Sequence, residues 1–307
     1  MLSSVTDSGT PALVVSAGEA LIDFLEQQDG SWLARPGGAG WNVARALAKI
    51  GLPAAFAGGI SDGPLGEPTL AASREAGLEL RYLRRYSAPP LLAFVPFGPN
   101  PDYFFVGNGS ADLLYQTEEL QADLKNVALI HFGGISLARP PLTQRLTELA
   151  QRARASGVRI SFDPNYRKLM DPSYRPTLER FCRLADLLKV SDEDLAGLFP
   201  ELSPQQALQR LSEWMEGRPL VLTKGAEGAE LHLGGSVWTL PAFKVAVRDT
   251  VGAGDALAAG LIASWLSESE AGWEAHLRFG LAAAAAACQH AGAYAPTLDD
   301  VAQLLRG

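Results

Sequence analysis

The chain has 307 residues, 47% of them hydrophobic, which is enough for a large core in one α/β domain or in two smaller ones. Its formal net charge of −8 argues against nucleic acid or an anionic membrane as the main partner, although an acidic protein can still bind ATP. No apolar segment approaches a membrane span, and the two cysteines suggest no disulfide framework, so we expect a soluble, cytoplasmic protein.

The first expected strand is the apolar run from Leu13 to Ala17. Asp23 follows it, and we place this acid where the opening strand gives way to irregular chain. Open α/β sheets bind ligands at such points. A single Asp after a strand is equally typical of a turn, so Asp23 alone does not define a site.

A glycine-rich loop comes next, from Gly37 to Asn42, and leads into a helix that ends at Gly51. Glycines here would let a neutral polyol approach the backbone closely. The Asn42 amide offers a donor and an acceptor, which suits a sugar hydroxyl. The alternative is a tight turn with a helix cap and no ligand.

Two β-rich runs, Leu91 to Phe97 and Asp102 to Val106, are separated by the turn Gly98 to Pro101. Together with Ser31 to Ala34, they predict a small antiparallel sheet beside the main body. Such a sheet could be a lid over a ligand, a dimerisation surface, or both.

From Val127 onward, expected strands alternate with helices, which indicates a mostly parallel sheet covered by helices on both faces. Polar residues follow the strand ends. Asp163 to Arg167 come after one strand, and Lys224 to Gly228 come after another. Because the carboxyl ends of parallel strands meet at one edge, these segments are candidates for a shared ligand crevice.

A second glycine loop, Asp249 to Asp255, runs directly into an apolar, helix-forming segment. Free amides and the positive end of the helix dipole would bind an anion there. Asp255 in the first turn makes sense if it takes a proton from a group that attacks a phosphate, but such an acid can also be only a dipole partner. There is no P-loop pattern, and Leu257 replaces the third glycine of a dinucleotide fingerprint.

The two glycine loops, in this order and with these neighbours, resemble the two signatures of the ribokinase-type (PfkB) carbohydrate kinases, and the resemblance covers nearly the whole chain. It implies a ribokinase-like three-layer α/β sandwich with a mostly parallel central sheet and a small antiparallel β lid. The expected organisation is one domain over residues 1–307, with lid segments at about 24–36 and 87–110. A homodimer formed through the lid is expected as well.

The family's roles carry over to matching positions as expectations. Asp255 would be the catalytic base, and the backbone of Gly252, Ala253 and Gly254 would bind the transferring phosphoryl group. Residues expected to bind the sugar are Asp23, Gly37, Gly38, Asn42 and Arg167. Residues expected at the ATP site are Lys189, Ser191, Thr223, Gly225 and Gly228.

The metal region departs from the family's Asn-x-x-Glu pattern, because Ser191 and Asp194 stand at the two positions. Asp194 would still order water around Mg²⁺, which keeps several waters when bound. The alternative is a helix-start acid. The family's monovalent-cation site would lie at Asp249 and Val251, near Gly292, and would hold K⁺.

The segments Gly18 to Asp23 and Phe162 to Arg167 look most like fructokinases, although 2-keto-3-deoxygluconate kinases share the second. Arg167 could bond a sugar carboxylate or neutral hydroxyls. Gly107 stands where fructokinases often have an arginine, and Trp41 replaces a small residue. Both changes are expected to face the sugar and argue against fructose. Fructose is nevertheless the first candidate, because the two segments above look most like fructokinases. The alternatives are a 2-keto-3-deoxygluconate kinase, a ribokinase, a nucleoside kinase or a non-catalytic sugar-binding regulator.

Overall fold

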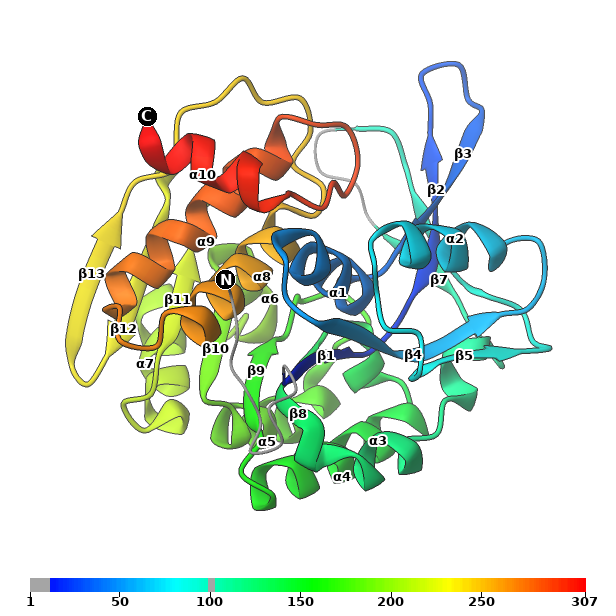
Figure 1. Ribbon diagram of the computed structural model, residues 1–307, viewed down its shortest axis with the longest axis horizontal. Coiled ribbons are helices and arrows are strands. Elements are labelled where there is room, and N and C mark those ends of the chain that lie inside the picture. Colours follow the sequence, from blue (N-terminus) through cyan, green and yellow to red (C-terminus); the bar gives the residue numbers. More distant parts are fainter. Residues whose placement is uncertain (1–11, 99–102) are drawn as a thin grey trace.

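The computed structural model describes residues 12–98 and 103–307, and a nine-stranded sheet runs through its centre (Figure 1). Neighbouring strands pair in parallel across most of this sheet, in the spatial order β5, β4, β1, β8, β9, β10 and β11. At one edge, β12 and β13 are added as antiparallel strands. This confirms the mostly parallel central sheet. In order across the sheet, the strands are β13 (Ser236–Leu240), β12 (Ala229–Leu233), β11 (Leu220–Thr223), β10 (Leu187–Ser191), β9 (Arg159–Asp163), β8 (Val127–Gly133), β1 (Leu13–Ala17), β4 (Ala54–Ser61) and β5 (Leu83–Tyr86).

Helices cover both faces of this sheet, so the predicted three-layer arrangement is confirmed (Figure 1). One face carries α1 (Ala39–Ile50), α2 (Glu67–Glu75), α8 (Ala253–Ser267) and α9 (Trp273–Cys288), with α10 (Leu298–Arg306) packed on α9. The other face carries α3 (Glu118–Ala122), α4 (Leu142–Ala155), α5 (Arg175–Leu184), α6 (Asp192–Leu198) and α7 (Pro204–Met215).

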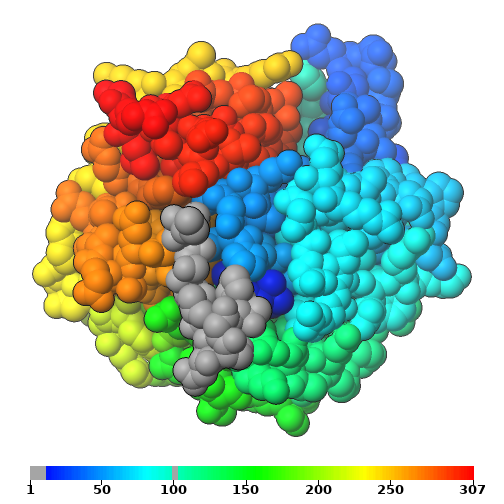
Figure 2. All heavy atoms as spheres, in the orientation of Figure 1, coloured from blue at the N-terminus to red at the C-terminus, as the bar shows by residue number. Residues whose placement is uncertain are grey.

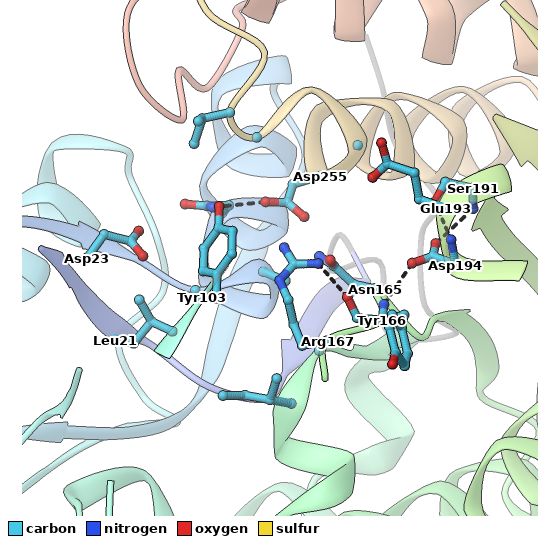
Figure 3. Close-up of a pocket in the computed structure, with 18 of the residues that line it drawn as sticks. Leu21, Asp23, Tyr103, Asn165, Tyr166, Arg167, Ser191, Glu193, Asp194 and Asp255 are labelled. Atoms are coloured by element: carbon cyan, nitrogen blue, oxygen red, sulfur yellow. Dashed lines mark hydrogen bonds between the residues drawn. The ribbon is translucent and has the colours of Figure 1, made fainter. Parts of the chain in front are cut away.

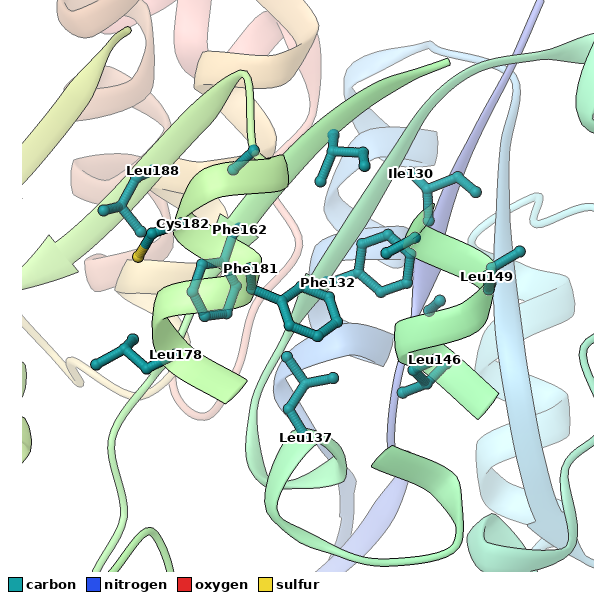
Figure 4. Packing of buried hydrophobic residues seen from close by; sticks show 14 of the residues in the cluster. Ile130, Phe132, Leu137, Leu146, Leu149, Phe162, Leu178, Phe181, Cys182 and Leu188 are labelled. Atoms are coloured by element: carbon teal, nitrogen blue, oxygen red, sulfur yellow. The ribbon is translucent and has the colours of Figure 1, made fainter. Parts of the chain in front are cut away.

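The central strands are apolar on both sides because each side is buried under helices. Val14 of β1 belongs to the core beneath α1 and α8, whereas its neighbour Val15 belongs to the core beneath α4 and α5. In that second core, the Phe181 ring of α5 lies 5.4 Å from the rings of both Phe132 and Phe162 (Figure 4). This packing fixes the strand ends on which the polar residues sit.

A second, smaller sheet stands beside the first, and its hairpin β2–β3 projects from the body (Figures 1 and 2). We refer to this sheet as the lid. The pairs β2–β3 and β6–β7 are antiparallel, but β2 and β6 are parallel, so the sheet is mixed. The predicted turn at 98–101 lies in part outside the described residues. The lid strands, in order, are β3 (Trp32–Gly37), β2 (Leu21–Glu26), β6 (Leu91–Val95) and β7 (Phe104–Val106).

Asp23 lies in the middle of β2, so the prediction that it sits in irregular chain is wrong. Residues 18–20 alone separate β1 from β2, and the chain passes from the large sheet directly into the lid. Asp23 pairs with Arg35 on one side and with Ala93 on the other. A mid-strand position holds its carboxylate more firmly than a loop would.

The two faces of the lid differ in character, since side chains alternate along each strand. Leu21, Asp23 and Phe105 face the cleft described below. The opposite face carries an aromatic row in which Phe24 stacks on Phe94 at 5.1 Å, and Phe104 follows at 6.3 Å. Within the described ranges, no helix has the length and apolar character that crossing a bilayer requires.

Candidate active site

A cleft of about 820 Å³ opens between the lid and the carboxyl ends of the central strands (Figure 3). Asp23 and Tyr103 lie on its lid side, Glu193 and Asp194 lie on the other, and Asp255 and Arg167 lie between them. The lining includes twelve of the residues singled out in the sequence, namely Asp23, Gly38, Asn42, Arg167, Lys189, Ser191, Asp194, Asp249, Val251, Gly252, Gly254 and Asp255. It does not include Gly37, Ala253, Thr223, Gly225 or Gly228.

A hydrogen bond joins the two glycine loops, because Asn42 Nδ2 donates to Asp255 Oδ2 at 2.9 Å. Asp255 is 7% exposed, and burial raises the pKa of its carboxyl to about 7, with the nearby Asp163 carboxylate acting in the same direction. Asn42, Lys189 and Arg167 act in the opposite direction. A carboxyl with such a pKa can exchange a proton near neutral pH. In the described chain, the buried oxygen Asn42 Oδ1 has no hydrogen-bond partner and is available to a ligand hydroxyl.

The N-terminus of α8 presents amides to the cleft. Gly252 caps the helix in the left-handed conformation, with φ of 78°. The Ala253 amide already donates to Thr250 O at 3.2 Å, and the first intrahelical bond runs from Ala256 to Gly252 at 2.9 Å. The amides of Gly254 and Asp255 therefore precede the helical ladder, at the end where the dipole favours an anion.

Lys189 lies at the same helix end. A side-chain carbon on Gly254 would come within 3.1 Å of Lys189 Nζ. The ammonium donates to Asp163 Oδ2 at 2.9 Å, and both side chains are buried. The Asp163 and Asp194 carboxylates raise the pKa of Lys189 against the effect of burial, so the lysine stays charged. Asp163 uses one of the three ammonium donors, and the cation can therefore also meet an anion in the cleft.

At the lid end, Asp23 and Arg167 face the same space. Burial raises the pKa of Asp23 to about 6, and the Arg167 guanidinium limits the shift. Arg167 Nη1 donates to Tyr166 O at 2.7 Å, and the guanidinium stacks 4.8 Å above the Tyr103 ring. A side chain on Gly37 would collide with the Asp23 carboxylate, so this glycine makes room for the acid without lining the cleft itself.

The carboxylate of Asp194 is held on both oxygens. Oδ1 accepts from the Tyr166 amide and Oδ2 accepts from the Ser191 amide, each at 2.7 Å. The Ser191 hydroxyl in turn accepts from the Asp194 amide, which makes this pair a capping box at the start of α6. Asp194 thus starts helix α6, as the alternative expected, and forms a capping box there, while its fixed carboxylate also lines the cleft beside Glu193.

Asp249 ties two loops together, since its carboxylate accepts from the Val251 amide at 3.0 Å and from the Gly292 amide at 2.7 Å. This places the segment around Gly292 behind the second glycine loop. In the part of the chain that the structure describes, no group of three or more His, Cys, Asp or Glu side chains could hold a metal ion.

The other residues expected at the ATP site lie at the end of β11 and in the turn after it, next to the cleft. Thr223 pairs with Ser191 across β10 and β11. Gly225 and Gly228 flank the turn that follows, and both have positive φ. A side chain on Gly228 would collide with Leu240 O, so the backbone of β13 requires this glycine.

Two residues that were expected to face the sugar do not. Trp41 is 1% exposed, lies outside the cleft lining, and donates from Nε1 to Ser73 Oγ of α2 at 2.9 Å. Gly107 is outside the lining as well, and a side chain there would collide with the guanidinium of Arg139. Arg139 forms a buried ion pair with Asp112. Neither position lines the cleft, so the expectation that both face the sugar is wrong.

Several cleft residues were not singled out in the sequence, among them Tyr103, Phe105 and Glu19. Tyr103 and Phe105 reach the cleft from the β7 segment, and Glu19 lies at its floor. The Glu19 carboxylate accepts from both the amide and the hydroxyl of Ser136, and burial raises its pKa. The alternation Glu19, Leu21, Asp23 is the one signal that could have placed Glu19 in the cleft.

Comparison with known proteins agrees with this geometry. Residues 11–300 match the model of the pfkB family carbohydrate kinases. A fructokinase of Rhizobium leguminosarum bv. trifolii is 34% identical over 262 residues, which cover 82% of this chain and 79% of that protein. The structure of a Xylella fastidiosa fructokinase with bound ATP superposes with a TM-score of 0.87, at 28% identity over 96% of this chain and 98% of the other.

A Salmonella enterica aminoimidazole riboside kinase, in complex with its riboside and an ATP analogue, superposes with a TM-score of 0.81, at 26% identity over 95% of this chain and 99% of the other. Relatives of this fold thus differ in the acceptor that they bind. The family itself is established by the match over most of the sequence together with two glycine loops joined at one cleft. The chain belongs to the PfkB family of carbohydrate kinases.

Proposed function

We propose that this kinase transfers the γ-phosphoryl group of ATP to a primary hydroxyl of a small sugar, and that the sugar is fructose. The observation that carries the proposal is the position of Asp255. Its buried carboxyl lies at the N-terminus of α8, between the lid side chains and the Lys189–Asp163 pair. A base that lies between a polyol site and an anion site suits phosphoryl transfer to a hydroxyl.

In this mechanism Asp255 accepts the proton of the attacking hydroxyl. Asn42 orients the carboxylate through its 2.9 Å hydrogen bond and offers its free oxygen to the sugar. Asp23, Gly38 and Arg167 bind the remaining hydroxyls, and Gly37 leaves space for the Asp23 carboxylate. Proximity and orientation of the two reactants supply much of the rate enhancement in such a reaction.

The developing phosphate charge meets preorganised donors. The loop Gly252, Ala253, Gly254 supplies backbone amides, of which that of Gly254 precedes the helical ladder. Lys189 supplies a cation held in place by Asp163. We place the rest of ATP along Ser191, Thr223, Gly225 and Gly228, at the edge formed by β10 and β11. Fixed donors are most effective where charge grows during the reaction.

Mg²⁺ would be held by the ATP phosphates and by waters ordered by Asp194, whose carboxylate is already fixed by two amides. The absence of a three-ligand cluster among the described residues fits a hydrated magnesium better than a zinc-like cage. When bound there, the metal would supply positive charge against the phosphate oxygens. K⁺ would bind at Asp249 and Val251, beside the Gly292 segment to which Asp249 is tied.

Fructose is preferred to a sugar acid on electrostatic grounds. Arg167 would attract a carboxylate, and this favours 2-keto-3-deoxygluconate as the second candidate. However, the guanidinium is already stacked on Tyr103, and its charge acts on the two carboxyls Asp23 and Asp255. Glu19 adds a third acid at the cleft floor. Such a surrounding suits a neutral polyol better than another anion.

The outward face of the lid suggests a homodimer. Phe104, Val106 and Trp32 are 64%, 45% and 43% exposed, and they gather around the stacked pair Phe24 and Phe94. An exposed apolar face of this kind marks an interaction site, and a second copy would bury the same residues on both sides. We also propose that the enzyme works in the cytoplasm, where ATP is supplied.

Asp255→Asn should lower turnover by roughly 10²–10⁴, the usual effect of losing a general base. Since the base must be ionised, kcat/KM of the unaltered enzyme should rise with pH and level off above about 7, following the raised pKa of Asp255. Steady-state kinetics from pH 5 to 9 measure both effects. Asp299→Asn, at another first-turn acid on the surface, is the control. A variant as fast as the parent would refute the assignment of the base.

A substrate panel tests the reaction. With ATP and Mg²⁺, ADP release should be fastest with fructose, compared with tagatose, ribose, 2-keto-3-deoxygluconate and adenosine. EDTA should abolish it, and excess Mg²⁺ should restore it. A clear preference for the sugar acid or for adenosine would exclude fructose as the natural acceptor. No ADP release with any compound would favour a sugar-binding regulator.

Arg167→Ala should raise the KM for the sugar by roughly 10–100-fold, as expected for a lost charge-assisted hydrogen bond, with a smaller change in kcat. Arg167→Lys should lie between, because it keeps the charge without the planar fork. Arg159→Ala, at the start of β9, the strand that precedes Arg167 in the chain, is the control. If KM stays unchanged for every acceptor, Arg167 has no part in sugar binding.

Sedimentation velocity tests the dimer. The unaltered protein should sediment at about twice its chain mass of 32.6 kDa, and Phe104→Lys should shift it to the monomer. Val237→Lys places the same charge at an exposed apolar site on β13 and should leave the dimer intact. A monomeric parent protein at micromolar concentration would contradict the proposal.

A further inference from the structure

Trp41 and Arg45 form a stacked pair on α1, the helix that also carries Asn42. The Arg45 guanidinium lies 4.4 Å above the Trp41 ring. The ring is also held at its edge, because its Nε1 donates to Ser73 Oγ at 2.9 Å and that hydroxyl donates to Thr69 O at 2.7 Å. Trp41 therefore serves as a rigid platform for Arg45 rather than as part of the cleft.

From this platform Arg45 reaches the C-terminal segment, where Nη1 donates to Ala293 O at 3.3 Å. Ala293 in turn supports the second glycine loop. A side-chain carbon on Gly252 would come within 2.9 Å of Ala293 Cα, so the two backbones are in direct contact there. The adjacent Gly292 amide donates to Asp249 Oδ2 at 2.7 Å. In Figure 2 the C-terminal segment lies against α1.

We propose that Arg45, supported by Trp41, is a positioning residue that holds the phosphoryl-binding loop, residues 249–255, against α1. The proposal rests on the proposed function for what the loop binds, but the contacts themselves do not depend on the substrate. Helix α1 meets the catalytic segment at two points. Asn42 donates a hydrogen bond to Asp255. One turn later, Arg45 donates to the carbonyl oxygen of Ala293, whose backbone contacts Gly252.

Stability alone does not account for this arginine. Within the described structure, Arg45 Nε is a buried donor with no hydrogen-bond partner, which costs free energy. Burial also lowers the pKa of the Arg45 guanidinium, although the Glu75 carboxylate partly opposes the shift. A shorter apolar side chain would avoid both costs. Retaining a cation here is reasonable if the position of Ala293, and hence of the loop, matters for catalysis.

The contact of Arg45 with Ala293, which we call the clamp, should act on turnover rather than on sugar affinity. The amides at the start of α8 must point at the phosphoryl group, and a displacement of about 1 Å can cost roughly 100-fold in rate. The sugar contacts on the lid side are made by Asp23 and Arg167, which Arg45 does not touch. A residue that only supported the fold would instead alter stability and affect all kinetic constants together.

Arg45→Met tests the proposal in two ways. In the ligand-free protein, hydrogen exchange of peptides covering 249–256 and 290–295 should become at least several-fold faster, while peptides of α2 keep the parent rate. With the preferred sugar, kcat should fall roughly 10–100-fold while the sugar KM stays within about threefold. Arg45→Lys should recover part of kcat. Lys49→Met is the control one turn further along α1, where Lys49 bonds Glu75 O, and it should leave kcat and exchange unchanged.

Unchanged exchange in 249–256, or a parent-like kcat, would overturn the clamp. If Arg45→Met fails to fold, Trp41→Phe keeps an aromatic ring but loses the Ser73 bond, and the same exchange and kinetic changes should appear at smaller amplitude. A parent protein that phosphorylates no sugar would refute the proposed function. In that case the exchange measurement alone decides on the clamp.

Discussion

The hydrogen bond between Asn42 and Asp255 is the contact on which the active site depends. It joins residues 213 positions apart and brings both glycine loops to one cleft. Asn42 lies in the first turn of α1 and Asp255 in the first turn of α8, so two helix N-termini approach the same place. Each loop is too short to bury a ligand alone. In the proposed function, the joined loops place the sugar hydroxyl beside the phosphoryl group.

Burial of this contact changes the acidity of the Asp255 carboxyl. Asp255 in water would be ionised at every physiological pH and would be a weak base. Desolvation brings its pKa to about 7, and the Asp163 carboxylate adds to the shift, while Lys189 and Arg167 keep the shift from going further. The neighbouring Lys189–Asp163 pair is buried as well, so each charge there has a partner. A cleft with this balance can hold a base that is partly ionised and a cation at the same helix end.

Much of the site could be predicted from sequence because its parts are local. A glycine loop before an apolar run marks a helix N-terminus, and both such loops line the cleft. Asp23 was misplaced because residues 18–20 look like the end of a strand, whereas the chain crosses there into the lid. The prediction that Trp41 faces the sugar was also wrong. A residue next to a ligand loop need not face the ligand, since each helical step turns the side chain by about 100°.

Tyr103 and Phe105 could not be found because their place in the cleft depends on how the lid sits over the central sheet. That placement follows from the pairing of β2 with β6, strands that are distant in sequence. Loop chemistry therefore predicts a phosphate site, whereas tertiary packing decides what else lines the cleft. In the proposed function, the same division separates reaction from specificity. The amides at the start of α8 and the Lys189 ammonium belong to the central sheet and its helices. Asp23, Tyr103 and Phe105 belong to the lid side of the cleft. Because the lid's other face is apolar and exposed, the proposed association through that face would constrain the lid side of the cleft without touching the loop 249–255.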